Sequence, residues 1–374
     1  MTDQKSTPIL PGELRPRDGR FGSGPSKVRQ EAVAALAAAA PGFLGTSHRQ
    51  APVRQVVGRI RAGLAELFDL PAGYEVALGN GGSTLFWDLA TFSLIERRSQ
   101  HLVFGEFSAK FAAAATAAPH LDEPQVIVSP FGSHPSPRPE PLVDLYALTH
   151  NETSTGVAMP IRRPSGAGGL VCVDATSAAG GLAVDPREFD VYYFAPQKSF
   201  AADGGLWLAC LSPAAVERAG RVAASGRHIP AMLDLGVALE QSRLDQTLNT
   251  PALATLFLLA NQLDWLLEQG GLAWATKRCD ESAGIVYGWA EASGYATPFV
   301  ADPAMRSHTV ATVDLDPSVE AAAVSRALRA NEILDTESYR KLGRNQLRIA
   351  MFPAIEPGDL DRLTRAVDWL VERL

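Results

Sequence analysis

The chain has 374 residues, of which 46% are hydrophobic and 20% charged, and its formal net charge is −7. This length allows two domains around a sizeable core. The acidic balance and the absence of a cluster of basic residues argue against a nucleic-acid surface, and no uninterrupted apolar stretch reaches membrane length.

The cysteines and the N-terminus point to a cytoplasmic protein. Cys172, Cys210 and Cys279 are far apart and lie in apolar surroundings, so we expect buried reduced thiols rather than disulfides or a metal site. The first residues lack the apolar core of a signal peptide. We therefore predict a cytoplasmic location and no bound metal.

Two helices are predicted ahead of the first strand. Residues Glu31–Ala40 are rich in alanine and are followed by Pro41 and Gly42, which we expect to end the helix. Val53–Phe68 has apolar residues at helical spacing.

From Glu75 the pattern changes to short apolar runs that alternate with helix-like segments. Continuous apolar runs are typical of strands that are buried on both faces. We therefore predict an α/β fold in which helices sandwich a mostly parallel, seven-stranded sheet. The predicted strands are Glu75–Leu78, His101–Phe104, Gln125–Val128, Leu145–Thr149, Leu170–Val173, Val191–Phe194 and Leu206–Leu211.

The C-terminal part of the chain has a different organisation. A long helix is predicted over Asn249–Gln269, and Gly270 and Gly271 end it. Beyond these glycines we predict an α+β domain with helices around 277–293, 319–329 and 357–373 and strands around 308–313 and 346–350. The resulting division is an N-terminal arm (1–20), a large domain (21–270) and a small C-terminal domain (271–374).

Ligands of open α/β sheets bind outside the carboxyl ends of the strands, and the predicted strands carry polar residues there. Gly79–Thr84 lies between a strand and a helix predicted over Leu85–Leu94, so its glycines, Ser83 and Thr84 could hold a phosphate at the helix N-terminus. The same residues could equally form a plain turn that caps the helix. The string His150–Gly156, which includes Thr153, favours a binding loop.

Lys198 and Asp174 are the most informative of the strand-end residues. Lys198 is one of six lysines and follows the apolar run Val191–Ala195, where burial would favour a neutral, nucleophilic amine. Asp174 ends another apolar strand and could cap the next helix or hold a protonated pyridine nitrogen. Together they are the pair that pyridoxal phosphate chemistry requires. Lys110 also follows a strand, but its alanine-rich context indicates a solvated helix face.

These strings, in this order, resemble the class V, fold-type I aminotransferases over nearly the whole chain. The resemblance rests on the segments Phe21–Ser26, Ser47–Arg49, Gly81–Thr84, His150–Thr153, Val173–Ser177, Gln197–Lys198, Asn249–Pro251 and Leu347–Ile349.

The resemblance implies a pyridoxal 5′-phosphate cofactor and assigns residues to it. Lys198 would form the Schiff base and move the proton between Cα and C4′. Asp174 would pair with the pyridine nitrogen, Phe107 would stack on the ring, and Thr153 would hydrogen-bond to it. The residues expected at the cofactor phosphate within the same chain are Ser83, Thr84 and Gln197.

The resemblance also implies a homodimer and a substrate site. In this family Asn249 and Thr250 reach the cofactor phosphate from the neighbouring subunit. His48 and Arg49 would bind the distal acid of the substrate, and Arg348 would bind its α-carboxylate.

The chain departs from the family pattern at two of these positions. Many members have an arginine where Thr84 stands, and that arginine helps to bind the substrate phosphate. The cations that could replace it here are Arg340, Lys341 and Arg344. Many members also have tryptophan in place of Phe107, and either ring can stack.

The expected reaction moves the amino group of L-glutamate to 3-phosphohydroxypyruvate, which gives 2-oxoglutarate and O-phospho-L-serine for L-serine biosynthesis. A second reaction, on the 4-phosphohydroxy-L-threonine of pyridoxine biosynthesis, is also open. The alternatives are an alanine–glyoxylate or serine–pyruvate aminotransferase, a cysteine desulfurase, and a non-catalytic protein that binds pyridoxal phosphate. The expected small-molecule substrates leave no role for a nucleic acid or a membrane.

Overall fold

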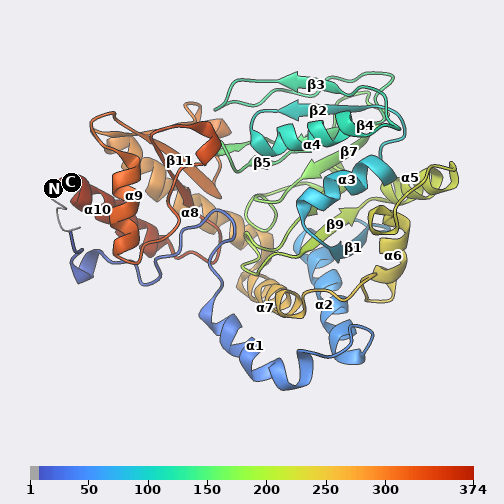
Figure 1. Cartoon of the computed structure of the whole chain (residues 1–374), viewed down its shortest axis with the longest axis horizontal. Helices are drawn as coiled ribbons and strands as arrows, with labels where there is room; N and C mark the ends of the chain where they lie inside the picture. The colour runs from blue at the N-terminus through green and yellow to red at the C-terminus, as the bar shows by residue number, and fades with distance from the viewer. Residues whose placement is uncertain (1–7) are drawn as a thin grey trace, which may run out of the picture.

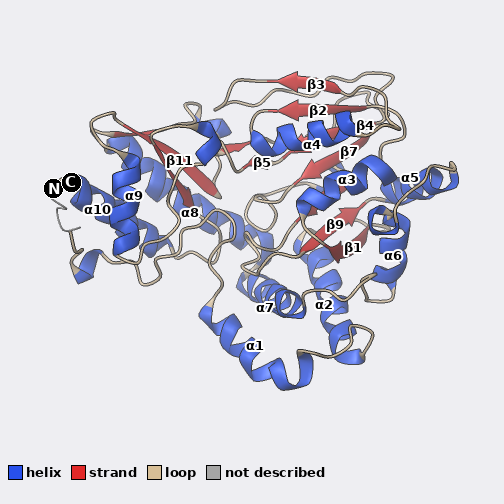
Figure 2. Cartoon of the chain, viewed as in Figure 1, coloured by secondary structure: helices blue, strands red, loops and turns tan. Residues whose placement is uncertain are grey.

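Seven strands form one central sheet in the computed structural model, which describes residues 8–374 (Figures 1 and 2). Their order is β1-β9-β8-β7-β4-β2-β3, and only β9 runs against its neighbours. Each of the seven predicted runs is one of these strands, so the predicted mostly parallel sheet is confirmed. The strands are β1 (Glu75–Asn80), β2 (Ser99–Val103), β3 (Gln125–Val128), β4 (Leu145–Thr149), β7 (Leu170–Asp174), β8 (Val191–Phe194) and β9 (Leu206–Leu211).

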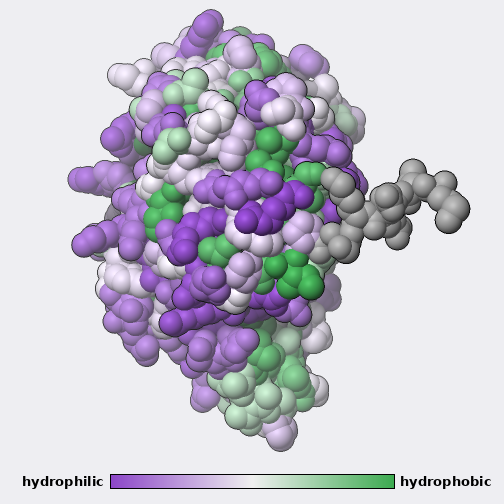
Figure 3. Space-filling view, turned by 90° about the vertical axis from the view of Figure 1, so that its left-hand side faces the viewer, coloured by the Kyte–Doolittle hydropathy of each residue, from purple (hydrophilic) through white to green (hydrophobic). Residues whose placement is uncertain are grey.

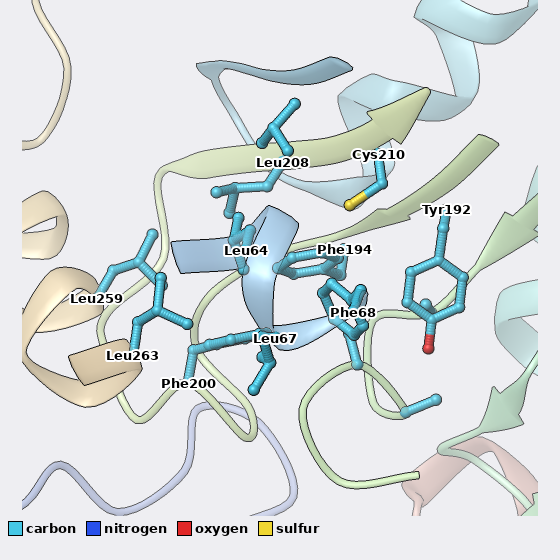
Figure 4. Close-up of a cluster of buried hydrophobic side chains, with 14 of the residues drawn as sticks. Leu64, Leu67, Phe68, Tyr192, Phe194, Phe200, Leu208, Cys210, Leu259 and Leu263 are labelled. Atoms are coloured by element: carbon cyan, nitrogen blue, oxygen red, sulfur yellow. The ribbon is translucent and has the colours of Figure 1, made fainter. Parts of the chain in front are cut away.

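Both faces of the sheet are covered at its centre, which explains why β4, β7, β8 and β9 are buried at every position. Along β8, Tyr192 and Phe194 belong to one core, and Val191 and Tyr193 belong to the core on the opposite face. The first core is shown in Figure 4, where α2 (Ala51–Leu67) and α7 (Leu253–Gln269) cover the strands. The helices on the other face are α3 (Ser83–Ser93), α4 (Glu106–Ala117), α5 (Pro213–Ala224) and α6 (Leu235–Arg243).

A second, smaller unit follows the large sheet. Its antiparallel sheet has the order β10-β11-β12, and its core also takes in Leu10, Leu14 and Phe21 from the start of the chain. We call this the C-terminal unit. It comprises α8 (Gly271–Ala292), β10 (Ala296–Pro298), β11 (Val310–Leu315), α9 (Ala321–Ala330), β12 (Gln346–Ala350) and α10 (Pro357–Val371). The domain boundary at 270 stays a prediction, because α8 contacts both α7 and α10.

Two further elements are neither strands of the large sheet nor part of the C-terminal unit. Helix α1 (Gln30–Phe43) projects from the bottom of the molecule in Figure 1. The short hairpin β5 (Asn151–Glu152) and β6 (Val157–Ala158) follows β4 and leads toward the C-terminal unit. Within residues 8–374, no helix combines the length and the apolar character needed to cross a bilayer.

The predicted helix boundaries were wrong at several ends, each for a local reason. Helix α1 continues past Pro41 to Phe43, because Leu44 N still donates to Ala40 O at 3.0 Å and closes the last turn. Helix α7 begins at Leu253 rather than Asn249, since the residue before a proline disfavours helical geometry and Thr250 precedes Pro251. Helices α3 and α8 begin at Ser83 and Gly271, earlier than predicted.

Asp144, just before β4, fixes the turn that joins α3 to β2. Its carboxylate accepts hydrogen bonds from the backbone N–H groups of Glu96, Arg97 and Arg98 at 2.7–2.9 Å. It also pairs at 3.2 Å with Arg218, whose side chain is 7% exposed. The Asp144 carboxylate therefore accepts from three backbone donors and shares the buried Arg218 guanidinium with Glu96, which lies 3.2 Å from Arg218 Nε.

We expect Asp144→Ala to lower the free energy of unfolding by about 2 kcal/mol, because three backbone donors lose their acceptor and Arg218 keeps only Glu96 as an acid partner. The matched control is Asp122→Ala, which breaks the exposed Arg97–Asp122 pair and should cost less than about 1 kcal/mol. Urea denaturation of both variants measures the difference. Equal losses in the two variants would contradict the assigned role of Asp144.

Candidate active site

A cavity of about 240 Å³ opens at the carboxyl ends of β4, β7 and β8, beside the N-termini of α3 and α4. We call it the Lys198 cavity. It brings together seven of the residues that the sequence assigned to a cofactor. The lining residues are Gly24, Gly82, Ser83, Thr84, Trp87, Phe107, Thr149, Asn151, Thr153, Asp174, Thr176, Gln197 and Lys198.

The Lys198 side chain is buried in the wall of this cavity, four residues after the end of β8. Its Nζ donates a hydrogen bond to the carbonyl oxygen of Ser23. Burial lowers the pKa of Lys198 to about 7, and the nearby positive charge of Arg348 acts in the same direction. A Cβ on Gly24 would lie 2.3 Å from Nζ, so this position requires glycine. The amine is thus close to neutral at physiological pH and held in one direction.

The carboxylate of Asp174 is held rigidly at the end of β7. Its Oδ1 accepts from the backbone N–H and the hydroxyl of Thr176 at 3.0 and 2.6 Å, and its Oδ2 accepts from the indole N–H of Trp87 at 3.2 Å. Burial raises the pKa of Asp174, although these hydrogen bonds oppose the shift. A buried carboxylate with this environment gains stability from a cationic partner, such as a protonated ring nitrogen.

The first turn of α3 offers an anion site at another side of the cavity. No side chain caps this helix, and the Ser83 hydroxyl is bonded at 2.6 Å to that of Thr176. Uncapped backbone N–H groups at a helix start favour an anion. Gln197 Oε1 is buried and has no hydrogen-bond partner within residues 8–374. The alternative of a side-chain cap on α3 is therefore wrong.

Thr153 lies on the floor of the cavity in a small hydroxyl network. Its Oγ1 donates to Ser177 Oγ at 2.7 Å, and Asn151 Nδ2 donates to the same atom at 2.8 Å. Thr309 Oγ1, from the C-terminal unit, donates to the Ser177 carbonyl oxygen at 2.7 Å. The loop after β4 is therefore fixed to both parts of the chain.

Phe107 is oriented by a buried acid that sequence reasoning did not single out. Glu152 caps the start of α4 by accepting from the backbone N–H groups of Phe107 and Ser108, at 3.1 and 2.9 Å. The Ser154 hydroxyl donates to the same carboxylate at 2.7 Å. A Cβ on Gly105 would lie 2.3 Å from Glu152 Cγ, so the approach requires glycine. Glu152 thereby sets the direction in which the Phe107 ring enters the cavity.

Besides Arg348, four predicted residues lie outside the lining of the Lys198 cavity, and these four form their own cluster. His48 is buried, and its Nδ1 lies 3.2 Å from the Thr250 hydroxyl. Arg49 and Asn249 are exposed, and Arg49 donates to Gln246 at 3.2 Å. Burial, together with the charge of Arg49, lowers the pKa of His48. We call His48, Arg49, Asn249 and Thr250 the 48–250 cluster.

Arg348 stands on β12 close enough to Lys198 to influence its charge. Burial lowers the pKa of Arg348, and its Nε is buried without a hydrogen-bond partner in the described part of the chain. Its guanidinium lies 5.3 Å from the centre of the Tyr339 ring. A guanidinium without an acid partner is suited to bind a carboxylate from solution.

Of the three cations proposed to replace an arginine at Thr84, two are occupied. Lys341 pairs with Glu106, and Arg344 pairs with Asp314 and stacks over Phe299 at 4.5 Å. For Arg340, which is exposed, no ion pair is found within residues 8–374. Thr84 itself is exposed at the start of α3.

Sequence reasoning missed Trp87 and Ser177 as well as Glu152. Trp87 could have been found from spacing, because it lies one helical turn after Ser83 and shares its face. Glu152 and Ser177 stand inside strings that were recognised, but their partners lie 44 and 24 positions away in the chain.

Comparisons with known proteins agree with this geometry. The family model described as aminotransferase class-V matches residues 37–336. A putative phosphoserine aminotransferase of Mycobacterium leprae is 61% identical to this chain, and the match covers the whole length of both chains. A phosphoserine aminotransferase of Nocardioides sp. is 60% identical over 98% of both chains.

Solved structures share the fold. A phosphoserine aminotransferase from Cytophaga hutchinsonii superposes with a TM-score of 0.85 at 25% identity, over 94% of this chain and 99% of that chain. One from Bacillus circulans subsp. alkalophilus gives a TM-score of 0.82 at 20% identity, over 95% and 99% of the two chains.

The lowered pKa of Lys198 leads to a labelling prediction. Because the amine is neutral above about pH 7, reductive methylation of Lys198 by formaldehyde and cyanoborohydride should rise with a midpoint near pH 7. A lysine in water titrates near pH 10.4. Peptide mass spectrometry of the cofactor-free protein measures the profile. The peptide that carries exposed Lys277 serves as the internal control, and the same midpoint for both peptides would refute the prediction.

Proposed function

The chain belongs to the class V aminotransferases, and we propose that it acts as a phosphoserine aminotransferase. It would transfer the amino group of L-glutamate to 3-phosphohydroxypyruvate, giving 2-oxoglutarate and O-phospho-L-serine. One observation carries the proposal: a single cavity joins a near-neutral lysine, a buried carboxylate and an uncapped helix start. The choice of substrate is supported by relatives of about 60% identity over the full chain.

The residues of the Lys198 cavity fit pyridoxal 5′-phosphate as the cofactor. Ser83, Thr84 and Gln197 line the cavity and would hold its phosphate, the two hydroxyls and the side-chain N–H groups of Gln197 acting as donors. Thr153 and the Phe107 ring would contact the pyridine ring. When bound, the cofactor supplies an aldehyde that takes up an amino group and a ring that accepts an electron pair.

Lys198 is the proton carrier in this proposal. Its near-neutral Nζ would take the proton from the α-carbon of L-glutamate and, in the second half of the reaction, return a proton to the α-carbon of the new amino acid. The Ser23 carbonyl oxygen holds the amine in position between these transfers.

Asp174 would keep a proton on the pyridine nitrogen. Its two oxygens are already oriented by Trp87 and Thr176, so little reorganisation is needed when the charge develops. The raised pKa that burial gives this carboxyl would fall once a cation stands beside it.

The two substrates share the charges that the binding residues can recognise. L-Glutamate and 3-phosphohydroxypyruvate each carry an α-carboxylate and a distal anion. Arg348 would hold the α-carboxylate, and His48 and Arg49 would hold the distal anion. One set of basic side chains can therefore serve both halves of the reaction.

We also propose a homodimer in which the 48–250 cluster completes the Lys198 cavity of the second copy. Within one chain the cluster lies outside that cavity. Helix α1, which precedes the cluster, exposes Val33, several alanines and the adjoining Leu44. The lowest part of the molecule in Figure 3, where α1 lies in Figure 1, is correspondingly apolar. A helix that is apolar on its exposed side calls for a covering surface.

Two further predictions are consistent with this function. The three cysteines are free and buried, which supports a reducing, cytoplasmic setting. A second reaction on the phosphorylated substrate of the pyridoxine pathway would use the same two anion sites.

The substrate is tested by comparing keto acids with L-glutamate as donor. We expect kcat/KM for 3-phosphohydroxypyruvate to exceed that for pyruvate and glyoxylate by about a hundredfold, because charged hydrogen bonds to the distal anion are lost with the smaller acids. Arg49→Met should remove most of this preference, and Lys198→Ala should abolish turnover. Lys277→Ala, on the exposed side of α8, is the control. Preference for glyoxylate or pyruvate would favour the alternative aminotransferases.

The shared cavity is tested by mixing two inactive variants. One chain carries Lys198→Ala, and the other carries both Asn249→Ala and Thr250→Ala. If the cluster acts across the interface, a mixed dimer of the two co-expressed chains has one intact site. Activity should then return to about a quarter of the wild-type value for random pairing. Each variant alone provides the baseline. No gain over the baseline would show that the cluster serves its own chain.

A further inference from the structure

Four side chains, two from α4 and two from the C-terminal unit, follow one another beside the Lys198 cavity. Lys110 Nζ lies 5.3 Å from the centre of the Phe107 ring, and that ring lies 5.9 Å from the Tyr339 ring at an angle of 56°. The Arg348 guanidinium follows at 5.3 Å from the Tyr339 centre. Tyr339 thus touches both the ring expected to stack on the cofactor and the arginine expected to bind the α-carboxylate.

Tyr339 is the contact that holds the Arg348 guanidinium. Within residues 8–374, the guanidinium takes part in no hydrogen bond or ion pair, and its Nε is buried. A long side chain held by neither would sample several rotamers, and ordering it when a ligand binds costs free energy. The attraction between the cation and the face of the Tyr339 ring favours the rotamers of Arg348 that keep this contact.

A second contact keeps Tyr339 itself in place. The next turn, Arg340–Leu342, carries Lys341, which pairs with Glu106 at the start of α4. Glu106 directly precedes Phe107, so the ring contact and the ion pair join the same two segments. The position of Tyr339 is therefore set from the large sheet and not only from the C-terminal unit.

We propose that Tyr339 is a positioning residue that pre-orients Arg348 for the α-carboxylate of both substrates. The inference rests on the proposed function, because it takes Arg348 as the carboxylate-binding residue. Both substrates carry the α-carboxylate, so loss of the ring should weaken both alike and leave the proton transfer at Lys198 little changed. Affinity for carboxylates falls, whereas kcat stays near its wild-type value.

The test uses the holoenzyme and glutarate, which carries both carboxylates of 2-oxoglutarate and cannot react. We expect Tyr339→Leu to raise the dissociation constant of glutarate about five- to tenfold, and Tyr339→Phe, which keeps the ring, to stay within about twofold. Isothermal titration calorimetry gives the constants. The concentration of L-glutamate that half-saturates the first half-reaction, followed by absorbance, should shift by the same factor.

The matched control is Trp369→Leu, which removes another cation–π contact of the C-terminal unit, that with Arg373 at 4.1 Å, far from the cavity. It should leave glutarate binding unchanged. In an Arg348→Met background, Tyr339→Leu should have no further effect, because the arginine through which the ring acts is gone.

Three outcomes would overturn the proposal: wild-type affinity in Tyr339→Leu, no rescue by Tyr339→Phe, or equal effects with and without Arg348. A wild-type protein that binds neither glutarate nor L-glutamate would remove its premise. Failure of the proposed acceptor is distinguishable, since it would show only with 3-phosphohydroxypyruvate, which neither measurement uses.

Discussion

Burial of an amine and a carboxyl group in one cavity is the constraint on which the rest of the structure depends. Water is excluded from Lys198 and Asp174, so the charged form of each is disfavoured and their pKa values move toward each other. Neighbouring parallel strands fix the pair, because Asp174 ends β7 in register with Tyr193 of β8. These strands lie near the middle of a seven-stranded sheet. Both strands are buried at every position, so the backbone that carries the two groups is fixed.

The loops that follow these strands are polar and buried, and polar groups without hydrogen-bond partners there would destabilise the fold. Residues of the C-terminal unit supply these partners. Thr312 Oγ1 donates to the Thr155 carbonyl oxygen at 2.9 Å, and Ser307 N donates to that of Gly156 at 2.9 Å. A Cβ on Gly156 would lie 2.6 Å from Thr312 Oγ1, so glycine permits this approach. The C-terminal unit therefore does more than carry Arg348. It fixes the loop that forms the floor of the cavity.

The sheet was predictable from sequence because burial on both faces leaves a pattern that is local in the chain. Lys198 and Asp174 were predictable for the same reason, since each directly follows such a run. Helix boundaries were harder to predict, because they depend on single hydrogen bonds such as that from Leu44 N to Ala40 O. Glu152 could not be assigned a role from sequence: a glutamate in a polar string has many uses, and only the fold brings it to the start of α4.

The chemistry and the choice of substrate have different physical origins in this protein. The amine, the acid and the anion site meet in one chain, and many aminotransferases share that fold. A distal phosphate needs cations, yet Thr84 offers none, and Lys341 is already paired with Glu106. The basic residues left for that task are Arg340, for which no ion pair is found within residues 8–374, and His48 and Arg49, which lie outside the cavity of their own chain. In the proposed dimer, one chain thus provides Lys198, Asp174 and Arg348, and the second chain adds the 48–250 cluster, whose His48 and Arg49 select among the keto acids.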